Sequence, residues 1–468
     1  MTARLAALLD DVEVAEIIGG DPWDVEVTSV TQDSAAVVPG SLYCCIVGRT
    51  VDAHDLAPAV VRAGAGSLLV ERVVDVAVPQ VRVVSTRQAV APIAAAFFGH
   101  PSSRLAVIGV TGTNGKTTTT HLIVTILRLA GRRTGLLGTL TGARTTPEAP
   151  VLQAQLAEFL DEGCEAVAME VSSMALDQHR ADAIDFAVAV WTNLTQDHLD
   201  YHGDMEAYFA AKARLFEPER CRAAVVNRDD PWAARLALRV PVTTYGLDDA
   251  EQLVTHARGS AFRWRDHLVN LSLGGLHNVS NALAAATTCA VLGVDPAIIV
   301  AGLTDAPPVP GRWEMIDGGQ DFAVIVDYAH TPDGIEQVLA AARAAIGPGA
   351  QLVVVFGCGG DRDRAKRPLM AAAATGLADV TVLTTDNPRS EDPLAIIAEV
   401  AAGAVDGATV VVEPDRDAAI GIAIDTAAPG DLVLIAGKGH ETGQIVGSRV
   451  LPFDDRQVAR AHLARRVG

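Results

Sequence analysis

Short apolar segments alternate with segments of helical length along most of this chain, and polar or glycine-rich residues follow one apolar segment after another. This alternation is typical of β-α-β units, in which parallel strands form a sheet and helices cover its faces. Because the carboxyl ends of parallel strands meet at one edge, ligands bind in the loops outside that edge. The sequence therefore predicts an α/β fold whose site is built from strand-end loops. Seven clusters follow predicted strands in this way: TGTNGKT, EVSS, TNLTQDH, DYAH, GCGGDRD, DNPR and GKGHE.

The length of 468 residues suits about three domains, since a typical domain has about 150 residues. A Pro/Ser-rich joint, HPSSR, and a Pro-rich segment, DAPPVPGR, mark the two expected boundaries. We predict a small α/β domain at residues 1–99, a central parallel-sheet domain at 100–312 and a third domain at 313–468. The third contains five apolar segments that predict strands: FAVIVD, QLVVVFG, DVTVLTT, TVVVEP and DLVLIAG.

The charge and the cysteines exclude several classes of protein. Acidic residues outnumber basic ones by 57 to 37, and the net charge of −20 argues against a broad nucleic-acid surface. Six cysteines without a C-x-x-C pair favour a reduced compartment, so we expect a cytoplasmic protein. The first twenty residues are too acidic for a signal peptide, and no apolar run approaches the roughly 20 residues that span a bilayer. We therefore expect no membrane insertion.

A glycine-rich cluster from Gly109 to Thr117 lies between a predicted strand and a helix expected to begin near Thr118. Its backbone N–H groups can cradle phosphate, Lys116 can reach the terminal phosphates, and Thr117 can hold Mg²⁺. Val110 stands where the common phosphate-loop motif has its first glycine, but the strand, the turn and the GKT sequence remain. The sequence favours a nucleotide site over a plain glycine-rich turn. The residues expected at this site are Gly112, Thr113, Asn114, Gly115, Lys116, Thr117 and Thr118.

Two residues near the ends of neighbouring strands are candidate Mg²⁺ ligands. Mg²⁺ prefers oxygen, and Glu170 follows a predicted strand, although an acid capping a helix beside Ser172 is the simpler alternative. His198 lies in the polar segment TQDHLDYHG, where a lone histidine is more often structural.

Lys212 is flanked by aromatic and aliphatic residues at helical spacing. Tyr208, Phe209, Leu215 and Phe216 fall on the same face of a predicted helix. The lysine can extend its ammonium to solvent from such a face. If it is buried instead, its pKa falls and the neutral amine can react with CO₂.

Together these motifs resemble the Mur ligase family of ADP-forming ligases, over about residues 31 to 460. The signatures are TGTNGKTTT, TTP, EVSSMALDQHR, TNLTQDHLDYHGDMEAYFAAKARLF, HNVSN, GRWE, VDYAHTP, GCGGDRDRAKRPLM, DNPRSEDP and GKGHE. The resemblance implies a UDP-binding first domain, a central ATP-binding domain and a C-terminal Rossmann-like domain for the incoming amino acid. It further implies a monomer that adds a third residue to UDP-N-acetylmuramoyl-L-alanyl-D-glutamate in peptidoglycan synthesis, through an acyl phosphate formed with ATP.

The resemblance also implies roles for individual residues. It makes Lys116, Lys212, His198 and Asp327 catalytic, with Lys212 carbamylated. It gives Thr117, Glu170 and His198 as Mg²⁺ ligands. Adenine and phosphate contacts are Asn278, Asn281, Arg312, Asp327 and His330. Contacts to the UDP-muramoyl-dipeptide are Ser34, Thr145, Thr146, Ser172, Gln178 and Arg180. Contacts to the amino acid are Arg362, Asp386, Asn387, Arg389, Gly437 and Glu441.

The motif DNPR selects meso-diaminopimelate by this resemblance. The planar guanidinium of Arg389 matches the distal carboxylate that lysine lacks, and Glu441 suits the distal ammonium. Ala35, Ala53 and Met174 depart from the family's motifs, but they leave the expected catalytic residues intact, and we expect an active enzyme. A lysine-adding relative and a catalytically idle nucleotide-binding protein are the alternatives.

Overall fold

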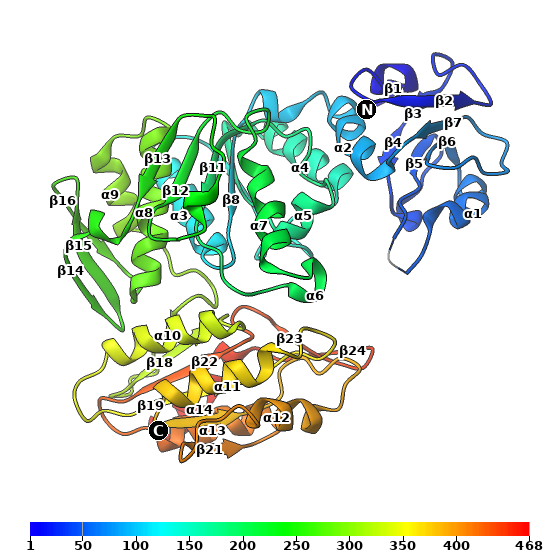
Figure 1. Ribbon diagram of the computed structural model, residues 1–468. Helices are drawn as coiled ribbons and strands as arrows, with labels where there is room; N and C mark the ends of the chain where they lie inside the picture. Colours follow the sequence, from blue (N-terminus) through cyan, green and yellow to red (C-terminus); the bar gives the residue numbers. More distant parts are fainter. Residues whose placement is uncertain (49, 468) are drawn as a thin grey trace.

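The computed structural model describes residues 1–48 and 50–467, which form three α/β domains (Figure 1). The predicted α/β class is confirmed: each domain contains a sheet that is wholly or mostly parallel. Among the described residues, no helix is long and apolar enough to cross a membrane. Short 3₁₀ helices connect larger elements at η1 Leu5–Leu8, η2 Ser34–Ala36, η3 Ala53–Leu56, η4 Pro101–Ser103, η5 Arg214–Phe216, η6 Ala233–Arg235 and η7 Leu247–Asp249.

The N-terminal sheet has five strands in the order β2-β7-β6-β5-β4, of which only β2 is antiparallel to its neighbour. Apolar residues of these strands pack against α2 and give the domain its own core. Strands and helices here are β1 Ala3–Arg4, β2 Val14–Ile18, β3 Glu26–Val27, β4 Ser29–Thr31, β5 Ser41–Cys44, β6 Ala65–Val70, β7 Gln80–Val83, α1 Ala57–Arg62 and α2 Thr86–Phe97.

The central sheet has six parallel strands in the order β13-β12-β11-β8-β10-β9. Its inner strands are apolar on both faces because α3, α8 and α9 cover one face and α4, α5 and α7 cover the other. The strands are β8 Ala106–Thr111, β9 Thr134–Leu137, β10 Ala166–Glu170, β11 Phe186–Trp191, β12 Ala224–Asn227 and β13 Val242–Tyr245. The helices are α3 Lys116–Leu129, α4 Ala149–Asp161, α5 Ser173–Asp177, α6 Leu199–His202, α7 Met205–Ala213, α8 Leu276–Val291 and α9 Pro296–Thr304.

A three-stranded antiparallel sheet, which the sequence analysis did not predict, packs against this domain. Its strands are β14 Glu251–His256, β15 Gly259–Trp264 and β16 His267–Leu271. Alternate residues such as Phe262 and Trp264 are buried in the central core. The turn between β15 and β16 has positive φ at Arg265 and Asp266, as a tight two-residue hairpin requires.

The C-terminal sheet has six strands in the order β17-β18-β22-β19-β20-β21, with only β17 antiparallel. The five predicted apolar strands are all confirmed, and helices pack on both faces as in a Rossmann-like domain. Figure 1 shows α10 on the side that faces the central domain, where it contacts α8. The strands are β17 Glu314–Met315, β18 Ala323–Asp327, β19 Leu352–Phe356, β20 Val380–Leu383, β21 Thr409–Val412, β22 Leu432–Ala436, β23 Gly443–Val446 and β24 Arg449–Pro452. The helices are α10 Pro332–Ala344, α11 Lys366–Leu377, α12 Pro393–Ala401, α13 Arg416–Thr426 and α14 Asp455–Val467.

Candidate active site

A cavity of about 670 Å³ lies between the central and C-terminal domains, and loops from both domains line it. It brings together most of the residues that the sequence singled out. These are Thr113, Asn114, Gly115, Lys116, Thr117, Thr118, Thr145, Thr146, Glu170, Ser172, Arg180, His198, Asn278, Asn281, Arg312, Asp327, His330, Arg362, Arg389 and Glu441. Strand-end loops that lie far apart in the sequence therefore share one space.

Other predicted residues do not line this cavity. Gly112, Lys212, Gln178, Asp386, Asn387 and Gly437 lie behind the lining residues or beside them. Ser34 lies on η2 of the N-terminal domain, and the cavity does not include it.

The glycine-rich loop connects β8 to α3, which begins at Lys116 rather than at the predicted Thr118. Gly112 and Gly115 have φ values of 148° and 85°, which favour glycine. A Cβ at Gly112 would collide with the hydroxyl of Thr192, and one at Gly115 would collide with the amide of Asn281. Lys116 Nζ donates to the carbonyls of Gly112 and Thr113, at 2.9 and 2.8 Å, and burial lowers its pKa.

Glu170 lies at the end of β10, beside the first turn of α3. Its carboxylate accepts from the hydroxyl of Thr117 at 3.0 Å and from the backbone N–H of Thr139 at 2.8 Å. The helix-capping alternative for Glu170 is wrong, because Ser172 caps α5 and accepts from the N–H of Ala175. Two side chains with oxygen atoms that can donate electron pairs to a metal, the Thr117 hydroxyl and the Glu170 carboxylate, therefore lie together at the phosphate loop.

These donors fit Mg²⁺, which binds through one or two protein oxygens and completes its shell with water and phosphate. Among the described residues, no group of three or more His, Cys, Asp or Glu side chains is arranged to hold a metal by itself. A site at Thr117 and Glu170 thus suits a metal that arrives with a nucleotide.

His198 lines the same cavity and lies next to Asp197, whose carboxylate is 3.4 Å from Nε2. Burial lowers the pKa of His198, although the charge of Asp197 opposes this shift. A neutral imidazole is the form that binds a metal. Asp197 is itself buried and was not predicted, because an acid beside a histidine in a polar loop resembles an ordinary turn residue.

Lys212 is buried, with 1% of its surface exposed. Its Nζ donates to the carbonyl of Gly112 at 2.7 Å and lies 4.6 Å from the centroid of the Tyr208 ring. The single helical face predicted around it is partly wrong: α7 ends at Ala213, so Leu215 and Phe216 belong to η5. Both are nevertheless buried. Burial lowers the pKa of Lys212 well below its ordinary value of 10.5, and the charge of Lys116 lowers it further.

The segment that joins the two domains carries Arg312 into the cavity. Its guanidinium donates to the hydroxyl of Thr117 at 3.1 Å and stacks 4.3 Å from the ring centroid of Tyr328. Asp327 fixes the adjoining backbone by accepting from the N–H of Trp313 at 2.7 Å. His330 lies nearby, and burial lowers its pKa to about 4.

Asp333 forms a further contact between the domains that the sequence analysis missed. It lies in the first turn of α10, and its Oδ2 accepts from Asn114 Nδ2 at 2.9 Å and from the hydroxyl of Thr195 at 3.0 Å. The C-terminal domain is therefore held directly against the phosphate loop. Only the folded arrangement reveals this, because these partners are more than a hundred residues apart in the sequence.

A second cavity of about 430 Å³ adjoins the first and shares Asn114, Gly115, His277, Asn281 and Gln337 with it. Carboxylates and amides after β12, together with alanines of α10, form its other walls. Asn278 lines the first cavity only; its side chain donates to Gly274, and Asn281 donates to Asn278 at 3.3 Å. The space is large enough for a purine and ribose beside the phosphate loop.

Thr146 and Arg180 also line the cavity, and Thr146 contacts Glu170 directly. Thr146 Oγ1 donates to the Glu170 carbonyl at 2.9 Å and accepts from the N–H of Ser172 at 3.1 Å. Arg180 donates to the Thr146 carbonyl and to Gln178 Oε1, at 3.1 and 2.6 Å. Gln178 therefore orients the arginine instead of lining the cavity.

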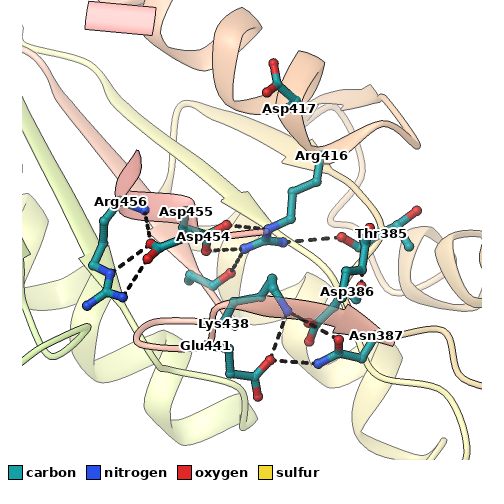
Figure 2. Close-up of polar contacts among 12 residues, drawn as sticks. Thr385, Asp386, Asn387, Arg416, Asp417, Lys438, Glu441, Asp454, Asp455 and Arg456 are labelled. Atoms are coloured by element: carbon teal, nitrogen blue, oxygen red, sulfur yellow. Dashed lines mark hydrogen bonds and ion pairs between the residues drawn. The ribbon is translucent and has the colours of Figure 1, made fainter. Parts of the chain in front are cut away.

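Arg389 and Glu441 line the part of the cavity that the C-terminal domain forms. Arg389 has a positive φ of 53° and donates to the carbonyl of Gly360 at 2.7 Å. Asn387 lies beside Glu441 and donates to its carboxylate at 2.8 Å (Figure 2). A cation and an anion thus face the same space, as a ligand carrying both charges requires.

Comparison with known proteins identifies this arrangement. The sequence family of the Mur ligase middle domain matches residues 110–289. The family described as the Mur ligase, glutamate ligase domain matches residues 311–439. A relative from Geobacillus thermodenitrificans, named UDP-N-acetylmuramoyl-L-alanyl-D-glutamate--2,6-diaminopimelate ligase, is 48% identical over 96% of each chain. A protein of the same name from Synechococcus elongatus is 46% identical over 95% of each chain.

Solved structures agree with these sequence relatives. A structure of a UDP-N-acetylmuramoyl-L-alanyl-D-glutamate--2,6-diaminopimelate ligase aligns over 100% of both chains, with a TM-score of 0.70 and 32% identity. A MurF ligase from Thermotoga maritima in complex with ADP shares the fold at 18% identity, with a TM-score of 0.65 over 94% of this chain and 98% of that one.

Proposed function

The chain belongs to the Mur ligase family, and we propose that it joins meso-diaminopimelate to UDP-N-acetylmuramoyl-L-alanyl-D-glutamate at the expense of ATP. The observation that carries the proposal is the single cavity of about 670 Å³, which places the phosphate loop, Glu170 and the Arg389–Glu441 pair together. A nucleotide, an acid and a diamino acid can therefore meet there.

The chemistry follows from the resistance of a carboxylate to attack by an amine. Transfer of the γ-phosphoryl group from ATP to the D-glutamate γ-carboxylate forms an acyl phosphate and ADP. The incoming amine then attacks the acyl carbon, phosphate leaves, the amine gives up a proton and an amide remains. Lys116 and Arg312 lie where they can offset the charge that develops on the transferred group.

Thr117, Glu170 and His198 are the proposed holders of Mg²⁺. The bound ion would neutralise charge on the phosphates and on the transferred group. Asp327 lines the cavity and is proposed to act catalytically at the same phosphates, and it also holds the backbone next to Arg312. His330 is assigned to the phosphates, and Asn278 and Asn281 to the adenine side.

Lys212 is proposed to react with CO₂. The neutral amine would attack the carbon of CO₂ and release one proton, giving a carbamate anion. Burial that disfavours an ammonium supports this assignment, as does the position of Lys212 next to Gly112 of the phosphate loop.

The N-terminal domain is proposed to bind the UDP part, with Ser34 among its contacts. Thr145, Thr146, Ser172 and Arg180 would receive the muramoyl-dipeptide, with Gln178 orienting the arginine. We propose domain boundaries at residues 1–99, 100–312 and 313–468. A monomer in the cytoplasm, with no nucleic-acid partner, completes the proposal.

The decisive experiment incubates the protein with ATP, UDP-N-acetylmuramoyl-L-alanyl-D-glutamate and one diamino acid at a time. ADP release and a tripeptide product are expected with meso-diaminopimelate and not with L-lysine. Release with L-lysine alone would identify a lysine-adding ligase. No release with either amine would identify an idle nucleotide-binding protein.

The Arg389→Lys variant tests the choice of amino acid. One point charge then replaces a guanidinium that can bind a carboxylate through two hydrogen bonds. We expect the ratio of diaminopimelate to lysine turnover to fall by about 10- to 100-fold. An unchanged ratio of the two kcat/KM values would refute the role of Arg389.

A further inference from the structure

Lys438 is a buried lysine that is not among the proposed catalytic or binding residues. It lies between the glycines of the loop after β22, and 0% of its surface is exposed. Its Nζ donates to Glu441 Oε2 at 2.9 Å and to Asn387 Oδ1 at 3.3 Å (Figure 2). It also donates to the Gly443 carbonyl at 2.7 Å. A lysine removed from water in this way must be stabilised by these partners.

The carboxylates around Lys438 belong to the proposed amino-acid site. Asp386 Oδ1 lies 3.7 Å from Nζ, within ion-pair distance. Burial raises the pKa of Asp386, and Glu441 adds to this rise, while the charges of Lys438 and Arg416 oppose it. Burial also opposes ionisation of Glu441, but Lys438, the hydrogen bond from Asn387 and the nearby His440 together lower its pKa. Without this cation, the buried carboxylate of Asp386 and the half-buried carboxylate of Glu441 would repel each other, and one of them would take up a proton more readily.

Lys438 also fixes the direction of the Glu441 side chain. Glu441 Oε2 accepts from both Lys438 and Asn387, at 2.9 and 2.8 Å. Within the described part of the chain, Oε1 accepts no hydrogen bond, and Glu441 lines the cavity. One oxygen is thus anchored, and the other remains available to a ligand.

The hairpin that follows is attached to the same residues. The N–H of Ile445 donates to Asn387 Oδ1 at 2.9 Å, and Gln444 Nε2 donates to the Asp386 carbonyl at 2.8 Å. The N–H of Arg389 donates to the Ile445 carbonyl at 3.0 Å. Lys438 therefore lies at the centre of contacts that join the DNPR loop, the GKGHE loop and β23.

We propose that Lys438 is a positioning residue for the amino-acid pocket, which holds Glu441 ionised and directed at the distal ammonium of the incoming diamino acid. This inference rests on the proposed function. Lys438 lines neither of the two cavities, so its effect acts on recognition of the amino acid through Glu441 and Asn387.

The test compares steady-state kinetics of the full chain and of Lys438→Met. We expect KM for meso-diaminopimelate to rise about 10- to 100-fold, because a charge-assisted contact is lost, while kcat and KM for ATP stay within about twofold. The increase in KM should grow as the pH falls, since the unpaired Glu441 protonates more readily. An unchanged KM at all pH values would overturn the proposal.

A double-mutant cycle separates positioning from general stabilisation. Glu441→Gln alone should raise KM, and adding Lys438→Met to it should raise KM little further. The double variant also removes the unpaired carboxylate at Glu441, which favours folding. Additive effects of the two substitutions would refute action through Glu441.

The matched control is Ile424→Ala, which removes buried side-chain volume from the C-terminal core on α13. It should destabilise the domain without changing KM for the amino acid. A rise in its KM like that of Lys438→Met would attribute the effect to stability and overturn the proposal. If the unmodified chain turns over no diaminopimelate, the proposed function itself fails, which is a distinct outcome.

Discussion

Lys212 in the central domain and Lys438 in the C-terminal domain are almost equally buried, with 1% and 0% of their surfaces exposed. Their surroundings differ. Lys438 forms ion pairs with Glu441 and Asp386 at 2.9 and 3.7 Å. Lys212 meets a backbone carbonyl and an aromatic ring, and none of the described acids lies within ion-pair distance of it. Burial alone therefore does not decide what a lysine does; its partners do.

The comparison predicts opposite uses of the two amines. A buried lysine with acidic partners is a fixed cation that organises its neighbours. A buried lysine without them favours the neutral amine, which is the nucleophilic form. The first kind suits substrate positioning, and the second suits covalent modification.

The largest expected effect is on turnover by Lys212→Met. Loss of the amine removes the proposed carbamate and its charge, so kcat should fall by about 10³-fold. ADP release measured at saturating substrates checks this, and Lys438→Met under the same conditions should keep its kcat. A Lys212→Met enzyme with kcat within tenfold of the unmodified chain would contradict a chemical role for Lys212.

The modification itself is measurable by mass. Intact protein kept under carbon dioxide should carry the additional mass of one CO₂ molecule, and Lys212→Met should lack it. An unmodified Lys212 in protein that is active with Mg²⁺ would contradict the carbamate.

The second expected effect is on stability, and here substitution of Lys438 should have the larger effect. Lys438→Met leaves Glu441 and Asp386 without their cation, so the free energy of unfolding should fall by about 3 kcal/mol. Lys212→Met breaks no ion pair and removes an amine whose pKa burial lowers, so at neutral pH the free energy of unfolding should fall by less than about 1 kcal/mol or rise. Urea unfolding of both variants measures the difference, and equal losses would show that the ion pairs of Lys438 contribute little.

The sequence predicted the parallel sheets well because apolar segments of strand length recur and polar or glycine-rich residues separate them. It also predicted that loops such as TGTNGKT and GKGHE share one site, because parallel strands place their carboxyl ends together. The sheet of β14–β16 was missed because its tight turn uses Arg265 and Asp266 and not the glycine or asparagine that usually marks a hairpin.

Roles that depend on distant partners could not be predicted. Lys438 and Asn387 are 51 residues apart, so in the sequence Lys438 is a lysine between two glycines, typical of an exposed loop. In the sequence Asp333 is likewise one acid among many, and only its hydrogen bonds from Asn114 and Thr195 in the folded structure show that it joins two domains. Lys212 was different, because its apolar neighbours are local and gave a signal before folding was considered.

The last expected effect is the contribution of Lys212 to the dependence of stability on pH, measured as the difference between the unmodified chain and Lys212→Met. In buffer free of carbon dioxide, its pKa in the folded protein lies well below the value of 10.5 expected when it is unfolded. Between these two values the unfolded chain binds one more proton than the folded protein. The free energy of unfolding should therefore rise with pH, by up to about 1.4 kcal/mol per pH unit, and level off above 10.5. Urea unfolding across this range should show a steeper rise with pH in the unmodified chain than in Lys212→Met, in which the lowered pKa of Lys116 still contributes. Carbon dioxide should flatten the slope, because a carbamate no longer titrates as an amine. The same slope in both proteins would mean that Lys212 is protonated when folded, and the two lysines would then differ in their partners but not in their charge.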